Sequence, residues 1–396
     1  MIQLNPHPSS ITLHPSSFIP HPFITSTFNE KNYRLVLLIL LVLLKLFNPP
    51  SSMEDAVKLY LKIPSTNKAK DDMDIIMGQN GFHDIAWSID SHNSVARFIS
   101  KLVSVLLVLV RVKKGNVLLI QYPFKKYYSL ICRLAHFKGG KVVTLVHDLG
   151  CFRRKKLTIA QELVRINNTD VLIVHNEAMQ QFLLSQGYRK PMVTLGIFDY
   201  LSSSPGRRPE KTAEEEWKVV YAGGLSHRKN SFLYELDDKI HNWHFHIYGG
   251  GLDEDKAQGW KNITPMGLVT PDYLIGNSVG HFGLVWDGSS IDECAGDWGE
   301  YLKVNNPHKT SCYLRSGKPV IMWNQSALAP FVEREGIGFT VSSLRDIDDK
   351  IKDITLDEYQ SMCRNAEVMS KRLAEGYYFK KAFAKAYELL DIARRG

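Results

Sequence analysis

The stretch "NNPHKTSCYLRSGKPVIMW", residues 305–323, contains the alternation on which most of the chain is built. Asn305 or Asn306 is suited to cap a helix, and Pro307 suits the first helical turn. "SGKP" is typical of a helix end, and "VIMW" is a short apolar run of the kind that forms a buried strand. The stretch therefore predicts a helix, a turn and a strand, in the order found in parallel α/β sheets.

Short apolar runs separated by helical stretches recur from residue 53 onward, and several are nearly continuous ("VLLI", "VVTLV", "VLIV"). Such runs are typical of parallel strands covered by helices on both faces. The predicted strands are Ala56–Ile63, Val117–Gln121, Val142–Val146, Val171–Val174, Trp217–Tyr221, His244–Tyr248, Phe282–Trp286, Val320–Trp323 and Gly338–Val341. We therefore predict an α/β fold of two doubly wound, Rossmann-like domains facing a central cleft, with ligands beyond the carboxyl ends of the strands.

Composition shifts suggest the domain boundaries. Residues 201–216, "LSSSPGRRPEKTAEEE", are rich in turn formers and charges, so they are predicted to form a linker. This linker separates a first domain, residues 53–200, from a second, residues 217–375. Residues 376–396 are predicted to form a C-terminal helix that could pack back on the first domain.

The first 52 residues differ from the rest of the chain. A segment rich in Pro, Ser and His precedes the apolar run Leu35–Leu44, which is ten residues long, whereas a membrane-spanning helix needs about 20. The charged start and the cleavage site of a signal peptide are both missing. A membrane-dipping anchor, a poor signal anchor and translation from an upstream start remain open. We favour the last, with Met53 as the natural beginning, and expect a disordered or non-native extension.

Bulk properties limit the compartment and the partners. The chain has 396 residues, of which 44% are hydrophobic and 23% charged, which is ordinary for globular proteins. Its five cysteines are scattered without CxxC spacing, which argues for a reducing, cytoplasmic compartment. The net charge is +8, and residues 53–200 carry 21 Lys and Arg against 12 Asp and Glu, which favours an anionic partner. The cations lie in turns and match no nucleic-acid-binding signature, so we predict no nucleic-acid partner.

Two glycine-rich turns follow strands of the second domain. "YAGGLSHRKN" places Gly223, Gly224, Ser226 and Arg228 between a strand and a probable helix, and "HIYGGG" places Tyr248 and Gly249 at another strand end. Glycines let backbone amides approach a phosphate, and Arg adds charge. The alternative is a plain turn with solvated basic residues. The pattern of a nucleoside-triphosphatase loop is not matched.

The opening stretch contains a third candidate. Lys309 and Thr310 fall in the first turn of the predicted helix, close to Asn306. A cation and hydroxyls at a helix N-terminus suit a diphosphate: the helix dipole is worth about 0.3–1 kcal/mol and a charge-assisted hydrogen bond about 1.5–3 kcal/mol. A surface lysine on an amphipathic helix is the alternative.

Candidate acid–base groups lie in the first domain. His147 and Asp148 directly follow an apolar strand and could supply a general base, although a buried histidine with a capping aspartate is equally compatible. Asp71 lies in a polar segment expected to face the cleft. The residues predicted on the acceptor side are Lys68, Tyr122 and Asn176. The apolar segment Ser94–Lys114 is read as a buried crossover helix, with docking on an anionic membrane as the alternative.

From residue 53 to about 390, the chain resembles bacterial GT-B glycosyltransferases, in particular the group of β-1,6-galactofuranosyltransferases and of glucosyltransferases that extend glycans on serine-rich adhesins. The carrying stretches are "HDLGCFR", "VHNEAM…LSQGY", "YAGGLSHRKNSF" and "NNPHKTSCYLRSGKPVIMWNQSALAPFVEREGIGF". The resemblance implies that the second domain binds a nucleotide sugar through Arg228, Tyr248 and Lys309, while the first binds the acceptor. The acidic E-x7-E pattern of many retaining members is not matched, because Glu293 and Glu300 precede the helix.

The resemblance implies a hexosyltransferase that moves galactofuranose, glucose or galactose from a UDP-sugar to a glycan acceptor, which could be lipid-linked. Galactofuranosyl chemistry would invert configuration, with Asp148 as first and Asp71 as second candidate base. No cofactor or metal is expected, because the D-x-D triples at 72–74, 253–255 and 346–348 do not follow strands as a metal site would require. Contact of the enzyme with the inner face of the membrane and assembly into a homo-oligomer are both compatible with this function. The alternative function is a non-catalytic nucleotide- or sugar-binding subunit.

Overall fold

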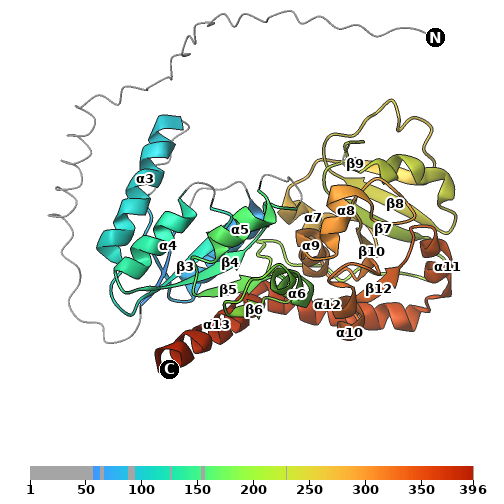
Figure 1. The fold of residues 1–396 in the computed structure, drawn as a ribbon. Coiled ribbons are helices and arrows are strands. Elements are labelled where there is room, and N and C mark those ends of the chain that lie inside the picture. Colours follow the sequence, from blue (N-terminus) through green and yellow to red (C-terminus); the bar gives the residue numbers. More distant parts are fainter. Residues whose placement is uncertain are drawn as a thin grey trace, which may run out of the picture. The chain divides into compact units, whose positions relative to one another are not determined.

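Figure 1 shows the computed structural model, which describes residues 57–62, 67–87, 94–124, 127–152, 157–228 and 230–395. The expected N-terminal extension, residues 1–52, and the start at Met53 lie outside the described residues. Residues 52–396 form one compact unit, and its described residues contain two parallel sheets of six strands each. We call residues 57–200 the first lobe and residues 201–375 the second lobe. The predicted α/β fold with two doubly wound sheets is confirmed.

The sheet of the first lobe has the strand order β2-β1-β3-β4-β5-β6, and every pairing is parallel. Its strands are β1 (Lys58–Tyr60), β2 (His83–Asp84), β3 (Val117–Tyr122), β4 (Lys141–Val146), β5 (Val171–Val174) and β6 (Met192–Thr194). Its helices are α2 (Lys68–Gln79), α3 (Ser94–Arg111), α4 (Tyr128–Phe137), α5 (Ile159–Ile166) and α6 (Glu177–Ser185). The central strands β3 and β5 are buried along their whole length, as their continuous apolar sequences require.

The sheet of the second lobe has the order β12-β11-β10-β7-β8-β9, again with parallel pairings throughout. Its strands are β7 (Trp217–Ala222), β8 (Trp243–Tyr248), β9 (Ile263–Gly267), β10 (Phe282–Val285), β11 (Val320–Trp323) and β12 (Gly338–Val341). Its helices are η1 (Ser231–Glu235), η2 (Asp237–Lys239), α7 (Pro271–Asn277), α8 (Gly296–Leu302), α9 (His308–Arg315), α10 (Ala329–Glu335), α11 (Asp346–Asp353) and α12 (Leu356–Ala374).

The apolar core explains why both sheets read as continuous apolar runs. Each sheet is covered on both faces, and three apolar clusters fill the interior. One of these clusters extends from Leu119 of the first sheet to Val220 and Met322 of the second. The two sheets therefore share part of their core, and burial of this shared surface stabilises both lobes together.

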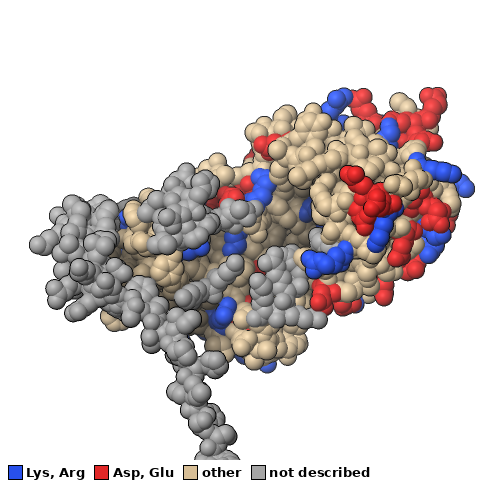
Figure 2. All heavy atoms as spheres, turned by 90° about the horizontal axis from the view of Figure 1, so that it is seen from above, with Lys and Arg blue, Asp and Glu red and all other residues tan. Residues whose placement is uncertain are grey.

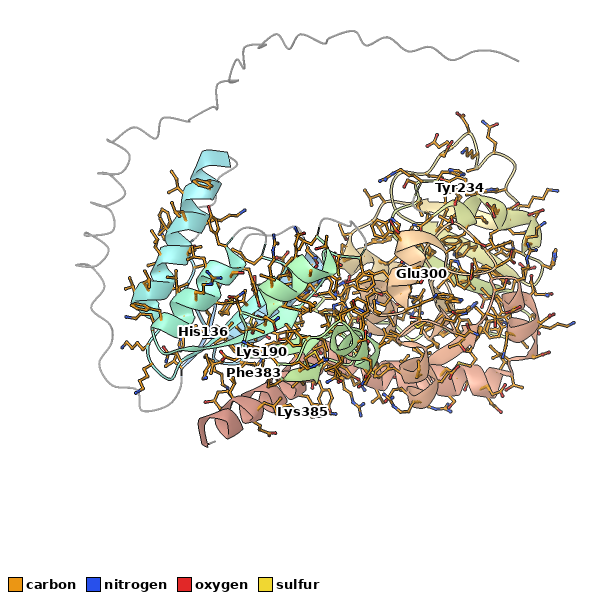
Figure 3. All side chains as sticks on the ribbon, in the orientation of Figure 1. His136, Lys190, Tyr234, Glu300, Phe383 and Lys385 are labelled. Atoms are coloured by element: carbon orange, nitrogen blue, oxygen red, sulfur yellow. The ribbon has the colours of Figure 1, made fainter. Side chains whose placement is uncertain are left out.

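The last helix, α13 (Tyr377–Arg395), contacts β5 and β6 of the first lobe after the chain has completed the second. Phe383, which Figure 3 labels on this helix, packs edge-on against Phe82, with ring centroids 4.7 Å apart. The carboxylate of Asp199 accepts hydrogen bonds from the backbone N–H groups of Tyr378 (3.1 Å) and Phe379 (2.7 Å). The end of the first lobe thus caps the start of α13.

Local differences from the sequence predictions occur at edges and caps. Three strands that the sequence did not predict, β2, β6 and β9, all lie at sheet edges. Each of these short strands pairs with one neighbouring strand, and its own sequence is too short to show a strand pattern. The cap of α9 was also predicted wrongly, because Pro307 occupies the N-cap and makes no side-chain cap bond. Asn306 hydrogen-bonds across to the first lobe instead.

Candidate active site

The glycine turns after β7 and β8 lie against each other at the carboxyl edge of the second sheet. The N–H of Gly223 donates to the carbonyl of Tyr248 (3.0 Å), and the N–H of Leu225 donates to that of Gly250 (2.9 Å). A Cβ on Gly249, whose φ is +151°, would lie 1.8 Å from the carbonyl oxygen of Gly223. Only glycine fits there, so both turns present bare backbone at this edge.

A buried asparagine that the sequence analysis missed braces these turns. Asn230 is fully buried, and its Nδ2 donates to the carbonyl of Gly224 at 2.6 Å. Its Oδ1 accepts from the N–H of Gly288, which follows β10, at 3.5 Å. Because one side chain links the ends of β7 and β10, the backbone of the edge is held in place. Asn230 ends the stretch "SHRKN", in which the sequence analysis considered only the glycines, the serine and the basic residues as functional groups.

Lys309 lies in the first turn of α9, as predicted, and points into this edge. Its Nζ is 3.0 Å from Asp287 Oδ1, 3.1 Å from the carbonyl of Trp286 and 3.3 Å from the hydroxyl of Tyr221. The ammonium also lies 4.4 Å from the centre of the Tyr221 ring. Asp287 lies two residues after the end of β10 and was missed by the sequence analysis. The cation is therefore fixed at the ends of β7 and β10, with a carboxylate beside it.

The other predicted donor residues lie in different surroundings. Gly224 and Ser226 are partly buried in the β7 turn, and Arg228 is exposed beyond it. Tyr248 is buried in the core, and its hydroxyl accepts from the N–H of Val279 at 3.1 Å, so it does not reach the edge. Thr310 is likewise wholly buried, which keeps its hydroxyl from the surface. Donor binding by these residues stays a prediction.

Asn306 and Asn176 were predicted on the donor and acceptor sides, and the structure joins them to each other. Asn176 Nδ2 donates to Asn306 Oδ1 at 2.7 Å, while Asn176 Oδ1 caps α6. Asn306 Nδ2 donates to the carbonyls of His175 (2.8 Å) and Gly196 (3.0 Å). Both amides are buried and already hydrogen-bonded, so they bridge the lobes rather than present free groups to a substrate.

His147 is held by a hydrogen-bonded chain that fixes its proton. Gln121 Nε2 donates to Asp74 Oδ1 (2.6 Å) and to the carbonyl of Lys70 (3.1 Å), which orients the amide. Gln121 Oε1 then faces His147 Nε2 at 2.6 Å, so Nε2 must carry the proton and Nδ1 the lone pair. The imidazole stacks on Phe198 at 5.1 Å, and burial lowers its pKa well below the usual range. His147 is thus neutral with one defined tautomer, and the lowered pKa makes its imidazole a weak base.

The two carboxylates predicted as bases are close in sequence to residues of the hydrogen-bonded network around His147. Asp148 follows His147 in the loop after β4 and is partly buried. Asp71 lies in the first turn of α2, three residues before Asp74, and burial raises its pKa. Burial also raises the pKa of Asp74 to about 7. Gln121 and Asp74 were not singled out from the sequence, although a polar residue within the apolar run "VLLIQY" was a usable signal.

Two residues predicted on the acceptor side are engaged inside the first lobe. Tyr122 is buried, and its hydroxyl donates to the buried carboxylate of Glu162. Lys68 pairs with Asp72 at 2.7 Å and lies over the ring of Tyr200 at 4.7 Å. The aromatic ring of Tyr122 therefore belongs to the core, and an acceptor role for this residue stays a prediction. Lys68 lies beside residues that join the lobes.

A cavity of about 770 Å³ is lined by residues of both lobes and of α13, Asn176 among them. Its charged lining residues are five cations, Lys303, Arg334, Arg372, Lys381 and Lys385, against two carboxylates, Glu177 and Glu335. Lys385 projects from α13 in Figure 3. On the face shown in Figure 2, by contrast, Lys and Arg side chains lie among Asp and Glu side chains over the second lobe. The cavity is therefore more basic than that surface.

Glu300 was considered above as part of an acidic pair with Glu293. Glu300, which lies on α8 (Figure 3), pairs with Lys303 at 2.8 Å and is exposed.

Within the described ranges, His, Cys, Asp and Glu form no group of three or more that could hold a metal ion. No helix in the described part of the chain is long and apolar enough to cross a membrane.

Comparison with known proteins identifies the family. Residues 62–197 match the family model "Glucosyltransferase 3-like, N-terminal domain", and residues 219–386 match the corresponding C-terminal domain. The chain is 31% identical over 291 residues to the β-1,6-galactofuranosyltransferase WbbI of Escherichia coli K12, covering 72% of this chain and 83% of WbbI. It is 25% identical to glucosyltransferase 3 of Streptococcus gordonii, covering 80% of this chain and 92% of that protein.

Solved structures agree on the fold. The complex of Anabaena HepE with UDP and glucose superposes with a TM-score of 0.53 at 12% identity, covering 84% of this chain and 99% of that one. At this identity the likeness concerns the fold alone. The matched sequence domains and the two parallel sheets agree over nearly the whole described chain, and they confirm the resemblance seen in the motifs. The chain belongs to the glucosyltransferase 3-like family and is a glycosyltransferase of the GT-B fold.

Proposed function

We propose that this glycosyltransferase moves a hexose from a UDP-sugar to a glycan acceptor during assembly of a cell-surface polysaccharide or glycoprotein glycan. The hexose would be galactofuranose, glucose or galactose. The relatives support this range, because one is named a β-1,6-galactofuranosyltransferase and another a glucosyltransferase. The HepE structures, which contain UDP or UDP-glucose, support a uridine donor.

The position of Lys309 carries the proposal. A fixed ammonium at the meeting point of β7, β10 and α9, beside two bare glycine turns, suits the diphosphate of a nucleotide sugar. Negative charge grows on the leaving diphosphate as the glycosidic bond breaks, so the cation stabilises the transition state more than the ground state. Asp287 would share the ammonium with the diphosphate once the donor binds.

We further propose that the reaction inverts configuration and needs no metal. Inversion requires a base that removes the proton of the acceptor hydroxyl as the new bond forms. Asp148 is the first candidate and Asp71 the second. Asp148 directly follows His147 in the loop after β4 and is only partly buried, which supports it as the first candidate. An Asp148→Asn variant with turnover near wild type would remove the first candidate.

The acceptor is proposed to carry phosphate, as a lipid-linked glycan does. The surplus of cations around the cavity of about 770 Å³ supports an anionic acceptor. Phe98 and Ile99 of α3 are exposed and apolar, which supports contact of this helix with the inner face of the membrane by a cytoplasmic enzyme. A homo-oligomer remains compatible with this arrangement.

The test is thermal unfolding with UDP, GDP or CMP, with and without EDTA, on the wild type and on Lys309→Ala. A nucleotide that binds the native state raises the midpoint by mass action. The expected result is a shift with UDP alone that survives EDTA and is lost in the variant. A shift that EDTA abolishes would contradict metal independence, and a shift unchanged in Lys309→Ala would contradict the diphosphate role.

A further inference from the structure

A second cavity, of about 320 Å³, lies at the opposite edge of the second sheet. Its lining residues come from the linker at 207–210, from the start of β7 and the residues before it, and from segments that precede β10 and β11. These segments precede or begin their strands, so the cavity is at the amino edge, whereas donors of doubly wound sheets bind at the carboxyl edge. Its lining residues are separate from the groups around Lys309, and its one link to a residue named above is the N–H of Val279, which donates to the hydroxyl of Tyr248.

Lys318 is the unusual residue of this cavity. It lines the cavity but is only 3% exposed, and its ammonium makes no hydrogen bond or ion pair with any described residue. An unpaired buried charge is strongly unfavourable unless an opposite charge accompanies it. The carbonyl end of α9 offers some compensation, which is limited to the last helical turn. Burial also lowers the pKa of Lys318 to about 8.

The carboxylates of the cavity do not neutralise Lys318. Glu215 pairs with Lys218 at 2.6 Å and lies 3.7 Å from His281 Nε2. Glu210 pairs with Arg207 at 3.7 Å, where both side chains are exposed. The two acids are therefore matched to two other cations of the lining.

Arg208 is the second cation of the lining without a carboxylate partner among the described residues. Its Nη2 reaches only the carbonyl of Gln360, at 3.5 Å. The linker that carries it packs closely on the end of α9: a Cβ on Gly206 would lie 2.2 Å from the carbonyl oxygen of Arg315, and one on Gly317 would lie 3.1 Å from that of Arg207. Arg208 and Lys318 thus line the same cavity on tightly packed segments.

We propose that this cavity binds a small molecule with a dianionic phosphoryl group, held between Lys318 and Arg208. Two positive charges without carboxylate partners match the two negative charges of such a group, and Arg can bind two of its oxygens at once. The cavity is large enough for a phosphate with a small organic substituent. Lys309 lies near the other end of α9, about 12 Å away for an eight-residue helix. The ligand would therefore bind apart from the donor.

The test is thermal unfolding of the full chain with millimolar inorganic phosphate, glycerol 3-phosphate or succinate at constant ionic strength. The variants are Lys318→Met, which keeps a side chain of similar length, Lys309→Met, and Lys371→Met as an exposed control on α12. We expect phosphate or glycerol 3-phosphate to raise the midpoint in the wild type, Lys309→Met and Lys371→Met, but not in Lys318→Met. Stronger binding of glycerol 3-phosphate than of phosphate would identify an organic ester as the ligand.

Each other outcome contradicts the proposal. No shift in the wild type would show that the cavity does not take a phosphoryl group. A shift lost in Lys309→Met but kept in Lys318→Met would place phosphate in the donor site. A shift with succinate alone would exclude the phosphoryl assignment. Lys318→Met should fold, because a buried methionine replaces an unpaired charge, and Arg208→Gln provides an independent variant with the same expected loss. Failure of UDP to bind would leave this test intact.

Discussion

At the scale of single residues, the affinity for the nucleotide-sugar donor depends on the groups that compete for the ammonium of Lys309. In the structure that ammonium pairs with Asp287 at 3.0 Å and with a backbone carbonyl. A diphosphate would have to share the ammonium with the carboxylate while being repelled by it. The pair therefore fixes the position of the cation at a cost in donor affinity.

Asp287→Asn is expected to tighten UDP binding severalfold. The amide keeps a hydrogen-bond acceptor for Lys309 but removes the negative charge, and one charge pair a few ångströms apart is worth at least about 1 kcal/mol. Isothermal titration with UDP measures the effect, with Asp292→Asn on the surface as a matched control. Weaker binding in Asp287→Asn would mean that this carboxylate contributes to the donor site.

Gln121→Leu is expected to lower kcat by about tenfold or more while leaving KM for the donor unchanged. The substitution removes the acceptor for His147 Nε2, so the imidazole loses its preferred tautomer and orientation. The pH profile of kcat should also change in shape, which a purely structural role would not produce. Gln186→Leu on the surface is the control. Equal kcat values and pH profiles in the wild type and Gln121→Leu would argue against His147 as a participant.

At the scale of elements, the C-terminal helix is stabilised by a residue far away in sequence. Asp199 supplies both carboxylate oxygens to the first N–H groups of α13, which a helix otherwise leaves unpaired. Burial raises the pKa of this carboxyl to about 7, despite the two donors. The cap therefore stabilises α13 although burial works against its charge.

Asp199→Ala is expected to lower the free energy of unfolding by about 1–3 kcal/mol, because two buried N–H groups lose their partner. Asp199→Asn keeps one acceptor and should lose less. Chemical denaturation measures the change, and Asp353→Ala at the exposed end of α11 serves as the control. Equal losses in the Asp199→Ala and Asp353→Ala variants would show that the cap contributes nothing.

At the scale of the whole molecule, the lobes are joined by buried polar contacts as well as by shared core. Asn306 bridges to Asn176 and His175, and Ser311 Oγ donates to the carbonyl of Phe198 at 2.6 Å. His175 Nδ1 accepts the N–H of Asn306 at 2.9 Å, and burial lowers the pKa of this histidine from 6.5 to about 3. The interface between the lobes therefore contains a histidine that stays neutral when folded.

This histidine predicts a loss of stability in acid. Below about pH 6.5 the unfolded chain protonates His175 while the native state does not, so the unfolded state is favoured as pH falls. Relative to His175→Gln, the wild type should lose about 1.4 kcal/mol per pH unit between roughly pH 6 and pH 4. Comparing the two proteins removes the opposite contribution of Asp199. A difference that is independent of pH would contradict the burial of a neutral His175.

Much of this organisation follows from short-range patterns. The apolar runs predicted all the strands that are buried on both faces, because a strand between two helical layers must be apolar on each side. The position of Lys309 in a first helical turn was likewise predicted, since the turn and strand after it set the helix boundaries. The edge strands β2 and β9 were not, because only their neighbours make them strands.

Only the tertiary structure decided which polar residues meet. Asn176 and Asn306 read as members of two different sites, yet 130 residues apart they share a hydrogen bond. The tautomer of His147 depends on Gln121 and Asp74, which come from separate elements. Local sequence determines the backbone path, because strand and helix patterns repeat over a few residues. The partner of a buried polar group depends on distant segments, because it is chosen by the packing of the sheets.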